Sequence, residues 1–219
     1  MNRPRIILNC ATSADGKLAL PDKTQVRISS DEDMKRVFEL RNSCDAVLVG
    51  SGAVLADDPK LTVKEKYVKH PRNPIRVVLD THLKTPIDAL VVNSDAPTIL
   101  FVGRDTKTPH QYVDTVEIIP CQTDKDGLID LHAMLEILYK KGIKSVLIEG
   151  GGTVLWSFLS KKLFDVLYVY IGPMIIGGSG TPTLADGNGV STGDEIIRLR
   201  IASTKRLGEG LLITYKLHQ

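Results

Sequence analysis

The sequence predicts an α/β protein built on a mostly parallel sheet that is closed by a C-terminal antiparallel hairpin. Apolar runs without alternation, such as Ala46–Val49 and Val146–Ile148, are typical of strands buried on both faces. Helical patterns alternate with these runs, which favours parallel strands joined by crossover helices. Near the end of the chain, Glu195–Leu207 and Leu211–Leu217 flank Gly208-Glu209-Gly210, and this pattern predicts the hairpin.

In the first half of the chain, the predicted strands end in polar or glycine-containing segments. Ile6–Ala11 is the first of them, and the Asp15-Gly16 turn signal after it predicts a hairpin continuing into Leu18-Ala19. A helix is expected to begin after Ser30, a good N-cap residue with Asp33 at the capping-box offset. Further strands are expected at Ala46–Val49, Pro74–Asp80, Thr98–Val102 and Val116–Ile119.

The second half begins with an amphipathic helix over Asp130–Lys141 that ends at Gly142. A buried strand, Val146–Ile148, then leads through a glycine turn into a helix over Thr153–Lys161. Another strand is expected at Asp165–Ile171. The glycine-rich segment from Gly177 to Gly193 is long, and loops of that length are usually mobile or functional.

The glycine turn Gly150-Gly151-Gly152 suits an anionic ligand. Glycine lets another molecule approach the main chain closely, and the start of a helix offers free N–H groups and a positive dipole end. Glu149 lies at the carboxyl end of the strand, where open α/β sheets place their ligands. The alternative is a tight turn that binds nothing. The turn does not match GxGxxG, because Leu155 occupies the third glycine position.

Composition and charge exclude several classes of function. The 219 residues carry a net charge of +2, which gives no argument for binding nucleic acid or membranes. The three scattered cysteines include no CxxC pair, so neither a disulfide framework nor a zinc site is indicated, and no metal is expected. We predict reduced thiols and a cytoplasmic protein. Neither a signal peptide nor a run of about 18 apolar residues is present.

Eight segments, in order, resemble a known family over nearly the whole chain. They are Ser13–Ala19, Arg27–Ser29, Leu40-Arg41, Asp45–Gly50, Val54–Thr62, Pro74–Asp80, Glu149–Gly152 and Asp165–Pro173. On these residues the sequence resembles the riboflavin-pathway pyrimidinone phosphate reductases, a family that shares its fold with the C-terminal domain of bifunctional riboflavin deaminase-reductases. The resemblance implies a three-layer, dihydrofolate-reductase-like fold with helices on both faces of the sheet.

The resemblance implies NADPH-dependent reduction of the ribose of 2,5-diamino-6-ribosylamino-4(3H)-pyrimidinone 5′-phosphate to a ribityl chain by a homodimer. NADH is the alternative cofactor. The deaminase signature HxE…PCxxC is absent, because Asp124 stands where Pro120-Cys121 would need a second cysteine. We therefore predict that residues 1–219 form a single reductase domain. The order of reduction and deamination stays open.

The resemblance also implies where each role falls. Cofactor contacts are expected at Ala53, Asp57, Leu79, Asp80, Thr81, His82, Gly151, Gly152, Thr153 and Val154. Substrate contacts are expected at Gln25, Arg27, Arg41, Leu61, Lys64 and Glu149. Arg104 is predicted to contact the 2′-phosphate of NADPH. Ala53 lacks the hydroxyl of the threonine frequent in the family, and Lys64 replaces an arginine, so it cannot bind phosphate in bidentate fashion.

Ring opening of the ribosylamine to an imine needs a proton donor at the ring oxygen, and a carboxyl shielded from water could provide it. Asp57 and Glu149 are the candidates, and our hypothesis is that Asp57 assists proton transfer while Glu149 orients the substrate. Spacing alone also permits structural roles: a capped turn at Asp57, a helix-end cation at Arg41 and a loop histidine at His82. Alternatives are a reductase of the same fold acting on the deaminated pyrimidine or on a pterin, and a non-catalytic nucleotide-binding module.

Overall fold

The computed structural model describes residues 2–107 and 112–218. The strands are β1 (Arg5–Ser13), β2 (Ala46–Gly50), β3 (Ile75–Leu79), β4 (Thr98–Gly103), β5 (Val116–Cys121), β6 (Ser145–Gly150), β7 (Val166–Gly172), β8 (Leu199–Leu207) and β9 (Gly210–Leu217). The helices are α1 (Asp31–Ser43), α2 (Ser51–Asp57), α3 (Leu131–Lys140) and α4 (Gly152–Ser160), with short 3-10 turns η1 (Leu90–Val92) and η2 (Gly193–Glu195).

The nine strands form one mostly parallel sheet in the order β5-β4-β3-β2-β6-β1-β7-β9-β8. The predicted α/β class with a C-terminal antiparallel hairpin is therefore confirmed. The chain divides into two compact units, of which the first holds residues 2–5 and 38–147 and the second holds residues 6–37 and 148–218. Among the described residues, no helix is long and apolar enough to cross a membrane.

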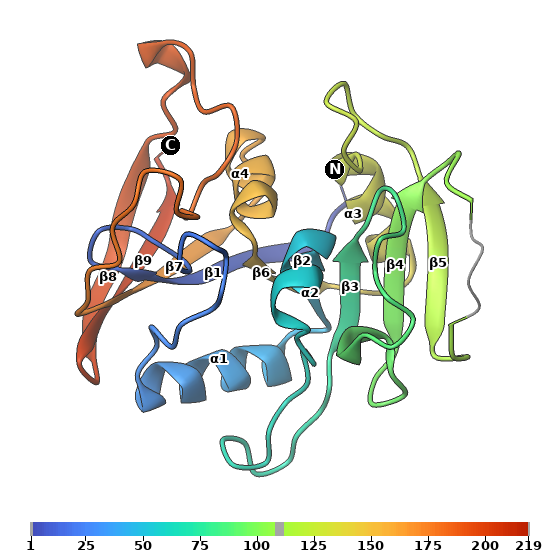
Figure 1. Ribbon diagram of the computed structural model, residues 1–219, viewed down its shortest axis with the longest axis horizontal. Helices are drawn as coiled ribbons and strands as arrows, with labels where there is room; N and C mark the ends of the chain where they lie inside the picture. The colour runs from blue at the N-terminus through green and yellow to red at the C-terminus, as the bar shows by residue number, and fades with distance from the viewer. Residues whose placement is uncertain (1, 108–111, 219) are drawn as a thin grey trace. The chain divides into compact units, whose positions relative to one another are not determined.

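In the first unit, β2, β3, β4 and β5 run parallel and side by side (Figure 1). All residues of β2 and β4 are buried, as their apolar runs predict. In register, Gly50 pairs with Leu79, Leu79 with Phe101, and Gly103 with Cys121. The carboxyl ends of these strands therefore share one edge of the sheet, where α2 and the chain after Leu79 and Gly103 begin.

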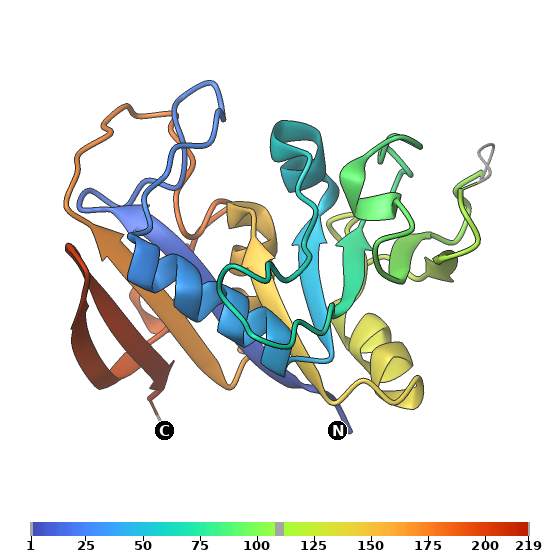
Figure 2. The same ribbon diagram turned by 90° about the horizontal axis from the view of Figure 1, so that it is seen from below.

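In the second unit, β1 and β7 are parallel, and β9 and β8 continue from β7 as an antiparallel hairpin (Figure 2). Ile28, Tyr170 and Leu212 form a buried cluster beneath this part of the sheet. The turn requires glycine at Gly208, whose φ is +60° and where a Cβ atom would overlap Ser30 and Glu32 side chains. Strand β8 lies at the edge and is exposed at seven of its nine residues.

Two local expectations differ from the structure. The turn predicted at Asp15-Gly16 is present, since Ser13 N–H donates to the Lys17 carbonyl at 2.9 Å. The continuation of the hairpin into a strand at Leu18-Ala19 was wrong, because Lys17 forms an antiparallel bridge with Thr183 and Leu18 N–H donates to the Pro182 carbonyl. The first arm of the C-terminal hairpin begins at Leu199 rather than at Glu195, because residues 193–195 form η2.

Candidate active site

The glycine turn of the second unit leaves the start of α4 without a side-chain cap. Helix α4 begins at Gly152 with Gly151 as its N-cap residue, and glycine has no side chain to cap the helix. Its first intrahelical hydrogen bond runs from Leu155 N to the Gly151 carbonyl, over 3.0 Å. The N–H groups of Gly152, Thr153 and Val154 therefore point out of the helix end, as an anion site requires.

Glycine suits each of the three positions of this turn for a different structural reason. Gly150 has a φ of +114°, which side-chain-bearing residues rarely adopt. At Gly152 a Cβ atom would lie 2.5 Å from both Asp186 Oδ2 and the Thr183 carbonyl oxygen. Gly151 has an ordinary φ of −69°, and no protein atom lies within 4 Å of the position of its Cβ. Gly151 is thus the position where the chain leaves room for another molecule.

The segment from Thr183 to Gly187 packs on the first turn of α4. The Asp186 carboxylate accepts hydrogen bonds from Thr183 N and Oγ1, at 3.0 and 2.6 Å, and Asp186 N–H donates to the Gly152 carbonyl at 3.3 Å. Gly187 lies against the Trp156 ring so closely that a Cβ atom would overlap it. These contacts fix one side of the helix end, so the long glycine-rich segment has a structural role here.

The other predicted residues of the second unit are Glu149, Gln25 and Arg27. Glu149 is half-buried and is the last residue but one of β6. Gln25 and Arg27 are exposed, and Arg27 makes an ion pair with Asp31. Glu149 is therefore beside the glycine turn in the chain, whereas Gln25 and Arg27 stay predicted contacts.

In the first unit, the carboxyl end of β3 is a tightly bonded turn. The Asp80 carboxylate is 1% exposed and accepts from Lys84 N at 2.9 Å and from Thr85 N and Oγ1 at 2.7 Å each. Burial and the nearby Asp80 carboxylate raise the pKa of Tyr112, whose hydroxyl donates to the Thr85 carbonyl. The carboxylate of Asp80 is thus used to build the turn, and its contact with a cofactor stays a prediction.

Residues after β3 and β4 are tied together at the same edge of the sheet. Gly103 N and Thr106 Oγ1 both donate to the Thr81 carbonyl, at 2.9 and 2.7 Å. His82 and Arg104 are exposed beside them, and Ala53 lies in the first turn of α2, which follows β2 directly. The structure therefore brings Ala53, Leu79–His82 and Arg104 to one edge.

The two carboxylates at the end of α2 differ in their surroundings. Asp58 adopts a left-handed conformation with a φ of +40°, and its Oδ1 accepts from Leu90 N at 2.7 Å. Asp57 is the last residue of α2 and is exposed. The protein chain therefore does not give Asp57 the shielding from water that the sequence analysis expected of a proton donor.

The predicted substrate residues of the first unit gather near Phe38. Arg41 Nη1 donates to the Thr62 carbonyl at 3.1 Å, and both Arg41 and Lys64 place their charges over the Phe38 ring. Leu61 is 2% exposed with a φ of +53°, so its side chain belongs to the core. Arg41 and Lys64 are thus brought together, as a site for a phosphate requires.

A reductase acting on a pterin would need a carboxyl group early in the chain that can donate a proton, and the early acid here, Asp15, is held ionised. Its carboxylate accepts from Ser13 Oγ at 2.6 Å, Ile176 N at 3.1 Å and Gly177 N at 2.7 Å. The hydrogen bond from Ser13, followed by that from Ile176, lowers the pKa of Asp15 from 3.8 to about 2. An ionised carboxylate cannot donate a proton, so Asp15 does not support the pterin alternative.

A pH-dependent contribution to stability follows from Asp15. Because its pKa is lower in the folded chain, the ionised carboxylate stabilises the fold above about pH 4, and this contribution is lost as the pH falls from about 4 to about 2. We expect Asp15→Asn to flatten the dependence of the unfolding free energy on pH in that window, measured by urea denaturation. The exposed-carboxylate control Glu209→Gln should keep the wild-type slope, and an unchanged slope in Asp15→Asn would contradict the assignment.

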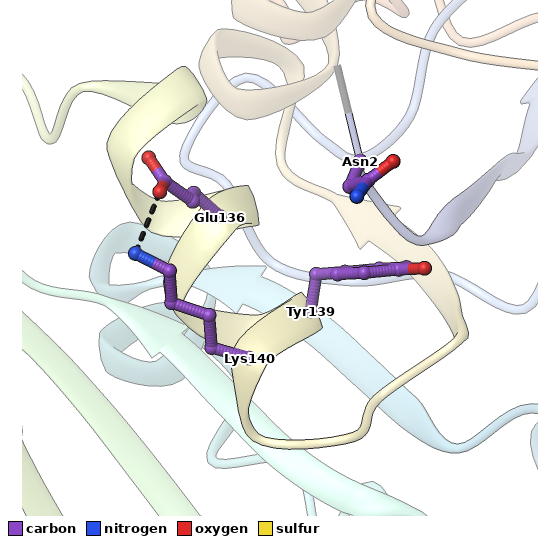
Figure 3. Close-up of a pocket in the computed structure, with 4 residues that line it drawn as sticks. All are labelled: Asn2, Glu136, Tyr139 and Lys140. Atoms are coloured by element: carbon purple, nitrogen blue, oxygen red, sulfur yellow. Dashed lines mark ion pairs between the residues drawn. The ribbon is translucent and has the colours of Figure 1, made fainter.

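A hollow of about 450 Å³ in the first unit holds none of these residues (Figure 3). It is lined by Asn2, Glu136, Tyr139 and Lys140, and Glu136 pairs with Lys140 at 2.6 Å along one face of α3. Asn2 precedes the amino end of β1, whereas the predicted site residues follow carboxyl ends of strands. Among the described residues, no group of three or more His, Cys, Asp or Glu side chains could hold a metal ion.

Sequence reasoning missed the residues that support the site. Thr183 and Asp186 were not singled out, although their spacing is that of a local side-chain turn. Phe38 and Tyr67, whose rings stack, were not singled out either. Thr183 and Asp186 contact the start of α4, and Phe38 contacts Tyr67 across a loop. Contacts of this kind join segments that are separated in the chain, so residue patterns do not reveal them.

A mostly parallel sheet with polar groups along the carboxyl edge of its strands is typical of ligand-binding α/β proteins. Within that class, the chain belongs to the RibD C-terminal domain family, which matches residues 4–213.

Two relatives match over almost their whole length, and both are named 2,5-diamino-6-ribosylamino-4(3H)-pyrimidinone 5′-phosphate reductase. That of Archaeoglobus fulgidus is 36% identical over 99% of this chain and 100% of its own. That of Methanothermobacter thermautotrophicus is 40% identical over 97% of this chain and 98% of its own.

Solved structures agree on the fold. The Thermotoga maritima diaminohydroxyphosphoribosylaminopyrimidine deaminase/5-amino-6-(5-phosphoribosylamino)uracil reductase has a TM-score of 0.83 and 28% identity. The match covers 99% of this chain and 57% of that longer chain. An Enterococcus faecalis dihydrofolate reductase crystallised with NADP(H) has a TM-score of 0.53 at 13% identity, over 98% of this chain and 97% of its own. The predicted dihydrofolate-reductase-like fold is confirmed.

Proposed function

We propose that this protein reduces the ribose of 2,5-diamino-6-ribosylamino-4(3H)-pyrimidinone 5′-phosphate to the ribityl chain of riboflavin biosynthesis, with NADPH as the reductant. The observation that carries the proposal is the open glycine turn before an uncapped helix, in a chain similar over its full length to two reductases named for this substrate. The protein is then an oxidoreductase acting on a small phosphorylated pyrimidine.

The start of α4 fits the phosphates of a dinucleotide. Three N–H groups without intrahelical acceptors and the positive end of the helix dipole favour an anion there, and Gly151 leaves the space free. Ala53, Leu79–His82 and Arg104 share the edge of the first unit where an α/β sheet binds its ligands. We propose that Gly151, Gly152, Thr153 and Val154 of the second unit bind the phosphates of the cofactor. The edge residues of the first unit are separately proposed as cofactor contacts.

In the proposed reaction, Asp57, Glu149, Arg41 and Lys64 have separate roles. We propose that bound substrate and cofactor would shield the Asp57 carboxyl from water, so that it gives a proton to the ribose ring oxygen and the C1′–oxygen bond breaks. The amino nitrogen loses its proton as the imine to C1′ forms. NADPH, when bound, would supply the hydride that C1′ accepts. The nitrogen then takes up one proton again, so the net addition is one hydride and one proton and the product is a secondary amine with a ribityl chain. Glu149 orients the substrate, and Arg41 and Lys64 bind its 5′-phosphate.

Steady-state consumption of NADPH with the amino and the deaminated forms of the ribosylaminopyrimidine phosphate tests the proposal. Turnover of the amino form supports it and puts reduction before deamination. Turnover of the deaminated form alone, the substrate that the name of the Thermotoga protein gives for its reductase activity, would keep the reductase and reverse the order. The proposal fails if neither form is turned over while NADPH still binds.

Arg104 is expected to set the preference for NADPH over NADH. It is exposed at the end of β4, on the edge assigned to the cofactor, and a guanidinium suits a phosphate dianion. Arg104→Ala should reduce the ratio of kcat/KM for NADPH to that for NADH by roughly 10- to 100-fold, as loss of one charge-assisted contact does. Lys84→Ala, also exposed after β3, is the matched control and should keep the ratio. An unchanged ratio in Arg104→Ala would remove Arg104 from the cofactor site.

We also propose a homodimer that uses the C-terminal hairpin. Strand β8 leaves its outer edge open, and Ile201 on it is 59% exposed. A partner pairing with this edge would satisfy its free backbone groups and cover the apolar side chain. The cytoplasmic location and the assignment of residues 1–219 to one reductase domain stay predictions.

A further inference from the structure

Two cationic side chains of the first unit share one aromatic ring. The guanidinium carbon of Arg41 lies 5.1 Å from the centroid of the Phe38 ring, and Lys64 Nζ lies 5.6 Å from it. The Tyr67 ring stacks on Phe38 with the centroids 4.8 Å apart and 7° between the planes. We propose that this Phe38–Tyr67 stack is a positioning element that holds Arg41 and Lys64 ready for one phosphate, so that the protein selects phosphorylated over unphosphorylated substrate. The inference deepens the proposed function and rests on it.

The stack joins α1 to the segment that carries Lys64. Phe38 is 2% exposed and stands three residues before Arg41 on α1, which puts the two side chains on one face of the helix. Tyr67 follows Lys64 in a turn, since Tyr67 N donates to the Lys64 carbonyl at 3.0 Å. The two rings therefore fix the distance between the two segments that supply the cations.

The main chain around Lys64 is anchored independently of the stack. Leu61 and Val63 are 2% and 8% exposed, and Val63 N donates to Asn73 Oδ1 at 2.9 Å. Loss of the Tyr67 ring should therefore leave this backbone in place. What it would release is the long, rotatable side chain of Lys64.

Both side chains that lie over the Phe38 ring, Arg41 and Lys64, are cations. Lys64 makes no ion pair with a carboxylate in the part of the chain that the structure describes. An aromatic face attracts a cation without neutralising its charge. Two neighbouring cations repel each other, and a bound dianion offsets that repulsion. A guanidinium fork and an ammonium point charge are complementary donors for the oxygens of one phosphate.

A positioning role has a kinetic signature that a merely structural role lacks. Tyr67→Leu should raise KM for the 5′-phosphorylated substrate and leave kcat near the wild-type value, because the reacting C1′ is not touched by the phosphate contacts. KM for the unphosphorylated ribosylaminopyrimidine should stay unchanged. Selectivity for the phosphate should fall by roughly five- to thirtyfold, the range expected from weakening two cation–π contacts.

The decisive measurement is the affinity for ribose 5-phosphate by isothermal titration calorimetry, because it does not require turnover. Tyr67→Leu should weaken it roughly five- to thirtyfold. Tyr67→Phe, which keeps the ring, should restore wild-type affinity. Tyr139→Leu is the matched control, since Tyr139 also lies under an ammonium group, Lys144 Nζ at 3.8 Å, but on α3. It should not change the affinity. Tyr67→Met is the second variant if Tyr67→Leu does not fold, because a long unbranched side chain fills the volume.

The outcomes separate this inference from the proposed function. Wild-type affinity in Tyr67→Leu, or equal losses for phosphorylated and unphosphorylated substrate, overturns the positioning role and leaves the reductase standing. The opposite outcome is also possible to distinguish. If the wild-type protein turns over neither pyrimidine but binds ribose 5-phosphate in a way that depends on the Tyr67 ring, the positioning role is supported and the proposed reaction is rejected.

Discussion

Replacing Asp57 by asparagine is expected to lower kcat by about two orders of magnitude or more, the usual contribution of a positioned general acid. Asparagine keeps the size of the side chain but has no acidic proton for the ring oxygen. Because Asp57 lies at the exposed end of α2 and asparagine keeps its size, the substitution should leave the fold unchanged and change the Kd for NADPH much less than kcat. The readouts are NADPH consumption for kcat and quenching of protein fluorescence for Kd.

Asp58→Asn provides the matched control for this prediction. Asp58 is the next residue, and its Oδ1 serves as an acceptor for Leu90 N, which an asparagine oxygen also does. This variant should keep near-normal kcat. If Asp57→Asn also turns over normally with intact NADPH binding, Asp57 is not the proton donor. A loss in Glu149→Gln alone would then assign the role to Glu149.

Gly151→Ala is expected to weaken NADPH binding by roughly 10- to 100-fold while the thermal unfolding midpoint changes little. The range corresponds to the loss of one charge-assisted hydrogen bond between the main chain and a phosphate. No protein atom lies within 4 Å of the new Cβ, and the φ of −69° suits alanine. A methyl group there would occupy only the space that we assign to the cofactor. Calorimetric titration with NADPH and a thermal melt measure the two effects separately.

Gly152→Ala is the contrasting variant at the neighbouring position. Its Cβ would lie 2.5 Å from Asp186 Oδ2 and from the Thr183 carbonyl, so the segment over α4 would have to shift. Both stability and NADPH affinity should fall in this variant. If Gly151→Ala binds NADPH like the wild type, the phosphates do not lie against this turn.

The fold was largely predictable because its signals are local. Strands β2 and β4 are fully buried, and their unalternating apolar runs indicate this directly. The Asp130 N-cap of α3 and the glycines of the β8–β9 turn are likewise evident in the sequence. The failed prediction concerned a strand at Leu18-Ala19. The chain there instead meets a distant segment, since Lys17 bridges Thr183 and Asp15 accepts from the N–H groups of Ile176 and Gly177. That contact spans most of the chain, so turn preferences could not reveal it.

The candidate site was predictable only in part, for the same reason. Gly151 and the start of α4 were predicted from the glycine run. The structure adds why glycine suits each position: the backbone conformation at Gly150, the close contacts at Gly152 and the open space at Gly151. Asp80 looked like a polar group at a strand end, but its carboxylate is used by Lys84 and Thr85. The Phe38–Tyr67 stack depends on how α1 meets a loop, and no sequence pattern encodes that geometry.

Transfer of deuterium from NADPH labelled at the nicotinamide C4 tests the central claim most directly. The proposed reaction predicts a product with one deuterium at C1′ of the ribityl chain, identified by mass spectrometry and NMR after incubation with the ribosylaminopyrimidine phosphate. The deuterium should be placed on each of the two faces of C4 in separate experiments. We expect deuterium to reach the product from one of these two labelled cofactors and not from the other. Deuterium in the pyrimidine ring, or oxidation of NADPH without label in the product, would contradict reduction of the ribose.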